Sequence, residues 1–221
     1  MYDLTLTFDN GPDPVVTPRV LDILGARGLK TTFFVIGEKL ADPERRALAV
    51  RAHGEGHWIG NHTFTHSIPL GEQPDRDAAT NEIGRTQAAI GDLAHPQRWF
   101  RPFGGGGNLD ARLLKPSAVD HLVRNGHSCV LWNAIPRDWD DPNGWTERAL
   151  DQCSRQPWTL LVLHDLSTGA MDHLERFLDR AEANGARFRQ DFPPQCVPIR
   201  NGEIALPIQD YVSCIEESNR P

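Results

Sequence analysis

Short apolar runs alternate with longer amphipathic stretches along almost the whole of this 221-residue chain. The short runs have the length of β-strands, and the longer stretches have the apolar spacing and closing glycines of helices. The clearest pair is the apolar segment 158–165 and the helical pattern at 169–185. Strand and helix alternate about seven times, an order that predicts a parallel α/β sheet with helical crossovers. Because the strands are short and evenly spaced, a barrel is favoured over an open sheet.

The composition changes near residue 190. We expect residues 1–190 to form one barrel domain and residues 191–221, rich in proline and polar side chains, to form a tail packed on it. Within the barrel, the helical pattern at 109–126 contains Pro116, where a kink or break is predicted.

The charge balance excludes some partners. The chain carries 23 Lys and Arg against 30 Asp and Glu, a net charge of −7, which argues against binding to nucleic acid. It has no apolar run long enough to span a membrane. Its N-terminal segment lacks the pattern of a signal peptide, so we expect a cytoplasmic protein, or an extracellular one if a leader was removed. The oligomeric state is left open.

The four cysteines are Cys129, Cys153, Cys196 and Cys214, and none forms a CxxC pair. Their spacing argues against a zinc knot and favours buried thiols. A disulfide between Cys196 and Cys214 is the alternative in an oxidising compartment.

Reactive side chains follow nearly every predicted strand. In parallel α/β folds, catalytic groups gather at the carboxyl ends of the strands, so these side chains are expected to form one site. They are Asp9 and Asn10, His62 and His66, Arg101, Asp138, and His164 with Asp165.

His62 and His66 are four residues apart, a spacing that would place both imidazoles on one side of a helical turn, within reach of one cation. The alternative is two ordinary histidines in a chain that has nine. Asp9 and Asn10, which leave a neighbouring strand just before a Gly-Pro turn, would supply an oxygen ligand and a group facing the reacting water.

His164 ends the most apolar strand, where an imidazole suits general acid catalysis. A carboxylate such as Asp138 beside it would raise its pKa, although a solvated acidic loop also accounts for Asp138 alone. Arg101 is costly to bury without a partner, so a carboxylate is expected next to it. The GGGG segment at 104–107 lacks the spacing and the lysine of a phosphate-binding loop.

Taken together, these segments resemble the polysaccharide deacetylase (NodB-like) family, whose motifs run TFDDGP, HxxxH, RxPY/F, a DxxDW-like loop and LxLHD. The matching segments occur in the same order over about 160 residues, and five ordered matches are a specific signal where one alone is weak. They are TFDNGP at 7–12, HTFTH at 62–66, RPFG at 101–104, RDW at 137–139 and LVLHD at 161–165. The resemblance implies a distorted (β/α)7 barrel and hydrolysis of N-acetyl or related C–N bonds.

The resemblance also implies a role for each matching residue. It makes Asp9 the general base and His164 the general acid, with Arg101 orienting the first and Asp138 tuning the second. It also implies a divalent metal, most simply zinc, bound by Asn10, His62 and His66. The backbone N–H of Phe103 would contact the oxyanion, and Trp139 would form a wall of the acetyl pocket.

Three departures from the family pattern bear on function. Asn10 replaces an aspartate ligand, which should weaken the metal site. Pro102 follows Arg101 directly, so the position of the oxyanion donor shifts by about one residue, and the fourth motif keeps only its last two residues. The main hypothesis is metal-assisted deacetylation of an N-acetylated sugar or oligosaccharide. The alternatives are a cytoplasmic cyclic amide or imide hydrolase and a non-catalytic carbohydrate-binding barrel.

Overall fold

Strands and helices alternate in the predicted order in residues 1–214, the part of the chain that the computed structural model describes. The strands are β1 (Tyr2–Asp9), β2 (Thr32–Val35), β3 (Trp58–Asn61), β4 (Trp99–Phe100), β5 (Ser128–Cys129), β6 (Trp158–His164), β7 (Ala186–Arg189), β8 (Ile199–Arg200) and β9 (Glu203–Ile204). The α-helices are α1 (Val16–Ala26), α2 (Pro43–Gly54), α3 (Arg85–Ile90), α4 (Pro116–Arg124), α5 (Trp145–Ser154) and α6 (Leu174–Ala183).

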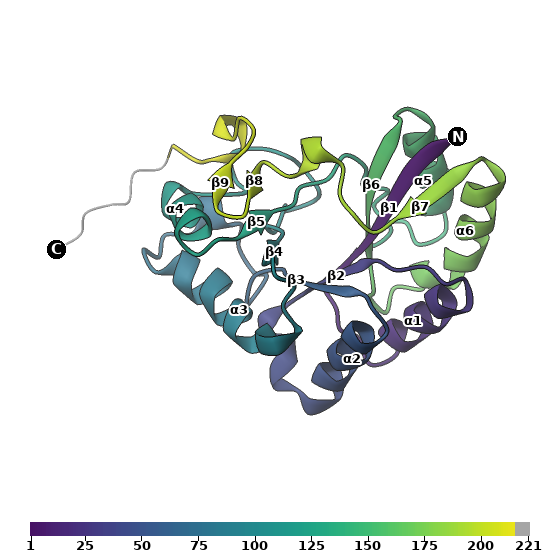
Figure 1. The fold of residues 1–221 in the computed structure, drawn as a ribbon, viewed down its shortest axis with the longest axis horizontal. Helices are drawn as coiled ribbons and strands as arrows, with labels where there is room; N and C mark the ends of the chain where they lie inside the picture. Colours follow the sequence, from purple (N-terminus) through teal and green to yellow (C-terminus); the bar gives the residue numbers. More distant parts are fainter. Residues whose placement is uncertain (215–221) are drawn as a thin grey trace.

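The sheet is curled, and its strands follow the order β6-β1-β2-β3-β4-β5-β8-β9, with β7 also paired to β1. All pairings among β1 to β7 are parallel, whereas β8 pairs antiparallel with β5 and β9. The chain beyond β5 reaches β6 through a single parallel bridge between Ala134 and Leu161. Helices line the outside of the arc (Figure 1). The predicted distorted (β/α)7 barrel is confirmed.

The alternation of side chains along β1 separates the core from the site. Leu4, Leu6 and Phe8 pack with apolar residues of the surrounding helices. Thr7 and Asp9, which follow Leu6 and Phe8 in this alternation, point to the other side of the sheet, where both accept hydrogen bonds from Arg101. Because successive strand residues face opposite sides, the last inward-facing position of β1 presents a carboxylate at the strand's carboxyl end.

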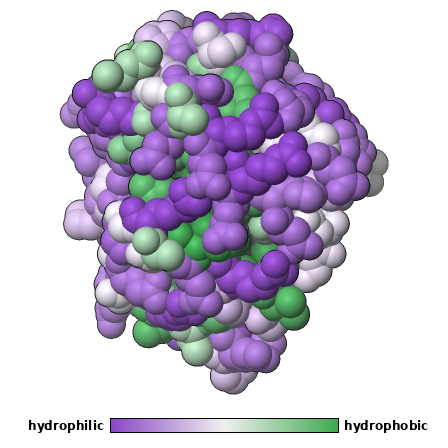
Figure 2. Space-filling model, turned by 90° about the vertical axis from the view of Figure 1, so that its right-hand side faces the viewer, coloured by the Kyte–Doolittle hydropathy of each residue, from purple (hydrophilic) through white to green (hydrophobic). Residues whose placement is uncertain are grey.

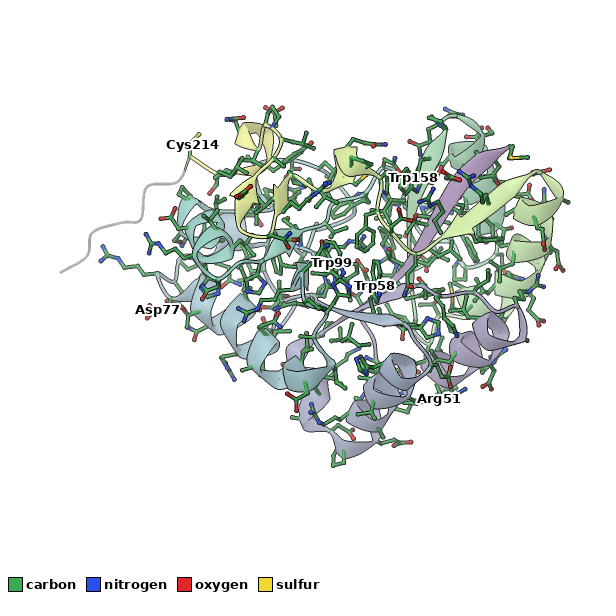
Figure 3. The ribbon with its side chains drawn as sticks, in the orientation of Figure 1. Arg51, Trp58, Asp77, Trp99, Trp158 and Cys214 are labelled. Atoms are coloured by element: carbon green, nitrogen blue, oxygen red, sulfur yellow. The ribbon has the colours of Figure 1, made fainter. Side chains whose placement is uncertain are left out.

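An aromatic cluster fills the opposite end of the barrel. Trp58 and Trp99, the first residues of β3 and β4, stack with ring centroids 5.8 Å apart and lie together in the middle of the molecule (Figure 3). Phe192, in the segment that follows β7, packs edge-on against Trp99. Phe192, Cys196 and Val197 thus pack at the amino ends of the strands, whereas β8 and β9 extend the sheet beyond β5 and Val212 pairs with Leu114. The rest of the expected tail, 215–221, lies outside the described residues.

Several predicted element boundaries are wrong for local reasons. Residues 109–115 are not helical, and α4 begins at Pro116, because proline fits the first turn of a helix, where its missing N–H has no partner to lose. Residues 80–93 do not form one continuous helix, because they divide into a π-helical turn, α3 and a 3₁₀ turn. The helix expected from residue 169 begins with a 3₁₀ turn at Ala170–His173 before α6.

The expectation of buried thiols holds for three of the four cysteines. All four thiols are free, and only Cys214 is exposed, so Cys196 and Cys214 do not form a disulfide.

No helix within residues 1–214 has the length and apolar character needed to cross a membrane. The face on the side of α1 and α6 is mostly hydrophilic, with hydrophobic surface showing between the polar groups (Figure 2).

Candidate active site

A cavity of about 240 Å³ opens at the carboxyl ends of the strands. Seven of the nine predicted site residues line it: Asp9, Asn10, His62, His66, Phe103, Trp139 and His164. The other two, Arg101 and Asp138, lie behind the wall and bond to lining residues. Side chains at the carboxyl ends of the strands therefore gather around one cavity, although they are up to 155 positions apart in the sequence.

Asp9 is held by a fully buried arginine. Arg101 Nη1 donates to Asp9 Oδ1 at 2.8 Å and to Thr7 Oγ1 at 2.6 Å. The guanidinium also lies over the ring of Phe34, 4.1 Å from its centroid. The second carboxylate oxygen, Asp9 Oδ2, stays on the cavity side, 3.5 Å from His62 Nε2. The buried pair fixes the carboxylate and leaves one of its oxygens available for chemistry.

His62 and His66 face each other, but not on a helix. The segment between them is an irregular loop in which Thr63 and His66 have positive φ values, so the helical turn expected there is wrong. The two rings still lie with centroids 4.7 Å apart. His62 Nδ1 donates to the carbonyl oxygen of Arg101 at 2.9 Å, which turns Nε2 toward the cavity. Burial lowers the pKa of each imidazole to about 3, so both are neutral and carry a free lone pair.

The third predicted metal ligand has an oxygen without a partner. Asn10 Oδ1 is buried and makes no hydrogen bond within the described residues. A buried polar atom of this kind is costly unless something binds it. No group of three or more His, Cys, Asp and Glu residues within 1–214 is placed to hold a metal ion. The groups that could hold a divalent cation are the two neutral imidazoles and the Asn10 amide oxygen, whose residues all line the cavity.

His164 is clamped by a carboxylate. Asp138 Oδ1 lies 2.8 Å from His164 Nδ1, and Asp138 Oδ2 accepts the backbone N–H of His164 at 2.8 Å. Burial alone lowers the pKa of His164, but the charge and hydrogen bond of Asp138 outweigh it, so the pKa is raised. Trp139 packs edge-on against the imidazole, with centroids 4.8 Å apart. The clamp fixes the imidazole in the cavity wall, and the raised pKa favours the protonated form that a general acid needs.

Sequence reasoning missed much of the cavity wall. Gly104–Gly107 line one side, and Trp132, Ile135, Val162 and Leu166 supply apolar contacts. The tetraglycine run was noticed only as a poor match to a phosphate loop, and the apolar residues carried no motif. The support of the Asn10 turn was also missed, since Lys39 Nζ donates to the carbonyl oxygen of Asn10 at 2.6 Å.

Asp165 packs beneath that turn. A side chain on Gly11 would overlap its carboxylate, and Thr17 donates a hydrogen bond to Asp165 Oδ2. Burial raises the pKa of Asp165 from 3.8 to about 7. The unfolded chain therefore loses this proton at a lower pH than the folded chain does. The stability that the protonated form provides is lost as the pH rises from about 4 to about 7.

We expect Asp165→Asn to remove this pH dependence, because its amide does not titrate. The free energy of unfolding of the wild type should fall between about pH 4 and pH 7, relative to the variant, by on the order of 3–4 kcal/mol. Urea unfolding at several pH values measures the difference. Asp22→Asn, at a side chain that is 69% exposed, is the control and should follow the wild type. Parallel curves for Asp165→Asn and the wild type would show that Asp165 is ionised in the folded protein.

The comparisons with known proteins agree on one family. The family model described as polysaccharide deacetylase matches residues 3–123, just over half of the chain. A chitooligosaccharide deacetylase of Rhizobium leguminosarum bv. phaseoli is 36% identical over 170 residues, which cover 73% of this chain and 67% of that protein. A peptidoglycan-N-acetylglucosamine deacetylase of Bacillus cereus is 28% identical over 191 residues, covering 84% of this chain and 66% of the relative.

A solved structure shares the architecture. The family 4 carbohydrate esterase from Streptomyces lividans, in complex with acetate, superimposes with a TM-score of 0.71 at 25% identity. The match covers 89% of this chain and 96% of that chain, so the likeness extends beyond the segment that the family model matches.

Proposed function

Because the chain belongs to the polysaccharide deacetylase family, we propose that it removes the acetyl group from an N-acetylated amino sugar in an oligosaccharide, assisted by one divalent cation. Membership confirms the predicted enzyme class, a deacetylase-type hydrolase acting on non-peptide C–N bonds. The substrates named for the two relatives share an N-acetylated hexosamine, and this is the substrate class we assign.

One observation carries the proposal: a base and an acid at the ends of adjacent strands. Asp9 and His164 are register partners in the parallel pairing of β1 and β6, and both line the cavity. Each is fixed from behind by a buried partner of opposite charge, Arg101 for the first and Asp138 for the second. A binding module has no need of this arrangement, whereas amide hydrolysis needs one group to take a proton and another to give one.

The steps follow from these positions. Asp9 accepts a proton from the water whose oxygen attacks the acetyl carbonyl carbon. The negative charge that develops on the carbonyl oxygen is stabilised by the backbone N–H of Phe103, which lies in the cavity wall. The C–N bond then breaks, and His164 gives its proton to the departing nitrogen. The products are acetate and the free amine, and both catalytic residues regain their starting charge once protons exchange with solvent.

Asn10 Oδ1, His62 Nε2 and the His66 imidazole are the groups that would hold the cation. When bound, a divalent cation polarises the substrate carbonyl and makes an attacking water more acidic. We propose zinc, because imidazole nitrogens are among its preferred ligands. The neutral amide of Asn10 makes this a weaker site than one with a carboxylate there.

We expect Asn10→Asp to raise zinc affinity by roughly tenfold or more, because it adds a full negative charge to the donor set. Asn10 has a positive φ of 71°, a conformation that Asn and Asp both tolerate, so the change adds little backbone strain. Calorimetric titration of zinc into the two metal-free proteins measures the affinity. Unchanged affinity would show that residue 10 does not face the metal.

The same pair of proteins separates the candidate functions. If the protein is a deacetylase, Asn10→Asp should raise acetate release from N-acetylated chito-oligosaccharides at low zinc. If the neutral amide at Asn10 instead marks a cyclic amide or imide hydrolase, the variant should bind zinc more tightly but turn over such a ring more slowly. A non-catalytic carbohydrate-binding barrel would show neither reaction in either form.

A further inference from the structure

The tetraglycine loop, Gly104–Gly107, forms a wall of the cavity next to Phe103. Three of its residues have positive φ values, 45° at Gly105 and 88° at both Gly106 and Gly107. Side chains rarely adopt this conformation, so glycine is required there for the backbone path alone. Within residues 1–214, none of the four N–H groups donates a hydrogen bond to the protein. The loop thus has four backbone N–H groups beside the cavity without a protein partner among the described residues.

Glycine is also required because the loop lies against two other wall residues. A Cβ atom on Gly104 would lie 2.6 Å from the Trp132 ring, and one on Gly107 would lie 2.7 Å from Ile135 Cδ1. Trp132 Nε1 donates to the carbonyl oxygen of Gly107 at 3.1 Å, which fixes the indole against the loop. A side chain at either glycine would therefore displace an apolar residue of the cavity wall.

We propose that this loop and wall form a subsite for a neutral pyranose ring of the substrate. A pyranose has a hydroxyl edge that needs hydrogen-bond partners and an apolar C–H face. The loop N–H groups suit the edge, and Trp132 with Ile135 suits the face. Arg112, whose Nη1 lies near Gly105, pairs with Asp110 through Nε and Nη2, so its charge is balanced beside the loop, which favours a neutral sugar over an anionic one. The subsite rests on the proposed function and specifies which residues select the sugar.

Two glycines of the loop offer a matched pair of variants. Gly106 and Gly107 share a φ of 88°, so replacement by alanine strains the backbone equally. Only the Cβ at 107 meets the wall, because nothing lies within 4 Å of a Cβ at 106. In a second variant, Gly104→Ala, the new Cβ contacts Trp132. Residue 104 has no positive φ, so this variant still tests the subsite if Gly107→Ala fails to fold.

The test compares two substrates, N-acetylchitotetraose and 4-nitrophenyl acetate, which has an acetyl group but no sugar. We expect the ratio of their kcat/KM values to fall about tenfold or more in Gly107→Ala relative to Gly106→Ala, the scale at which forced overpacking acts. Gly104→Ala should lower the ratio as well. Binding of the tetrasaccharide to metal-free protein, measured by calorimetry, should weaken in parallel.

Equal ratios in the 106 and 107 variants, with Gly104→Ala like the wild type, would overturn the subsite while leaving the proposed function standing. A wild-type enzyme that cleaves the aryl acetate but releases no acetate from the tetrasaccharide would overturn both. The two failures are therefore distinguishable in one set of assays.

Discussion

Asp9→Asn should lower kcat for acetate release by roughly 10²–10⁴-fold, which is the usual contribution of a positioned general base. The amide has the size of the carboxylate and can still accept the hydrogen bond from Arg101 Nη1, but it cannot take a proton from water. Steady-state acetate assays at saturating zinc measure the loss. A variant that keeps more than about a tenth of the wild-type kcat would exclude Asp9 as the base.

The fold of this variant should survive with reduced stability. Arg101 would lose the carboxylate with which it pairs, and breaking a buried pair costs on the order of 3–5 kcal/mol. Thr7 and the carbonyl oxygens of Val130 and Leu131 still accept from the guanidinium. Thr7→Val is the matched control, because it also removes an acceptor of Arg101 but leaves the base, so kcat should fall far less.

His66→Gly should lower zinc affinity by roughly 100-fold or more, since even residues behind the ligands change affinity by 10–100-fold. The substitution suits the backbone, because His66 has a φ of 52°, where glycine is unstrained. Its imidazole packs on Phe103 and on His62, with centroids 4.0 and 4.7 Å apart, so the substitution removes contacts within the cavity wall. Zinc content after gel filtration and calorimetric titration report the affinity.

The control for this variant is His53→Ala, at an exposed histidine of α2, which should bind zinc like the wild type. Activity of His66→Gly at limiting zinc should fall with the affinity and recover in part when free imidazole is added. Full zinc retention by His66→Gly would mean that His66 is not a ligand and that the donor set has been assigned wrongly.

Most of the site residues were predictable because they end a strand or follow it closely. Asp9 and His164 close β1 and β6, whose apolar runs are plain in the sequence, and parallel strands must bring their carboxyl ends together. Arg101 follows β4 directly, where a charged group in an apolar run indicates a buried partner, and that partner is Asp9. These predictions needed only the order of the elements.

The rest depended on packing that no local pattern records. Trp132 and Ile135 reach the cavity because the chain beyond β5 leaves the sheet and meets β6 at a single bridge. The HTFTH segment has helical spacing, yet left-handed residues at Thr63 and His66 bring the rings together through a loop. The extra strands β8 and β9 have two residues each, too few to show an alternating pattern.

Product stoichiometry tests directly whether the protein hydrolyses an N-acetylated oligosaccharide. The purified protein, loaded with zinc, is incubated with N-acetylchitotetraose, and acetate and free amino groups are measured in the same samples. We expect equal amounts of acetate and free amine, loss of both on chelation of the metal, and recovery of both when zinc is restored. Absence of both products from the zinc-loaded protein would contradict the proposed function.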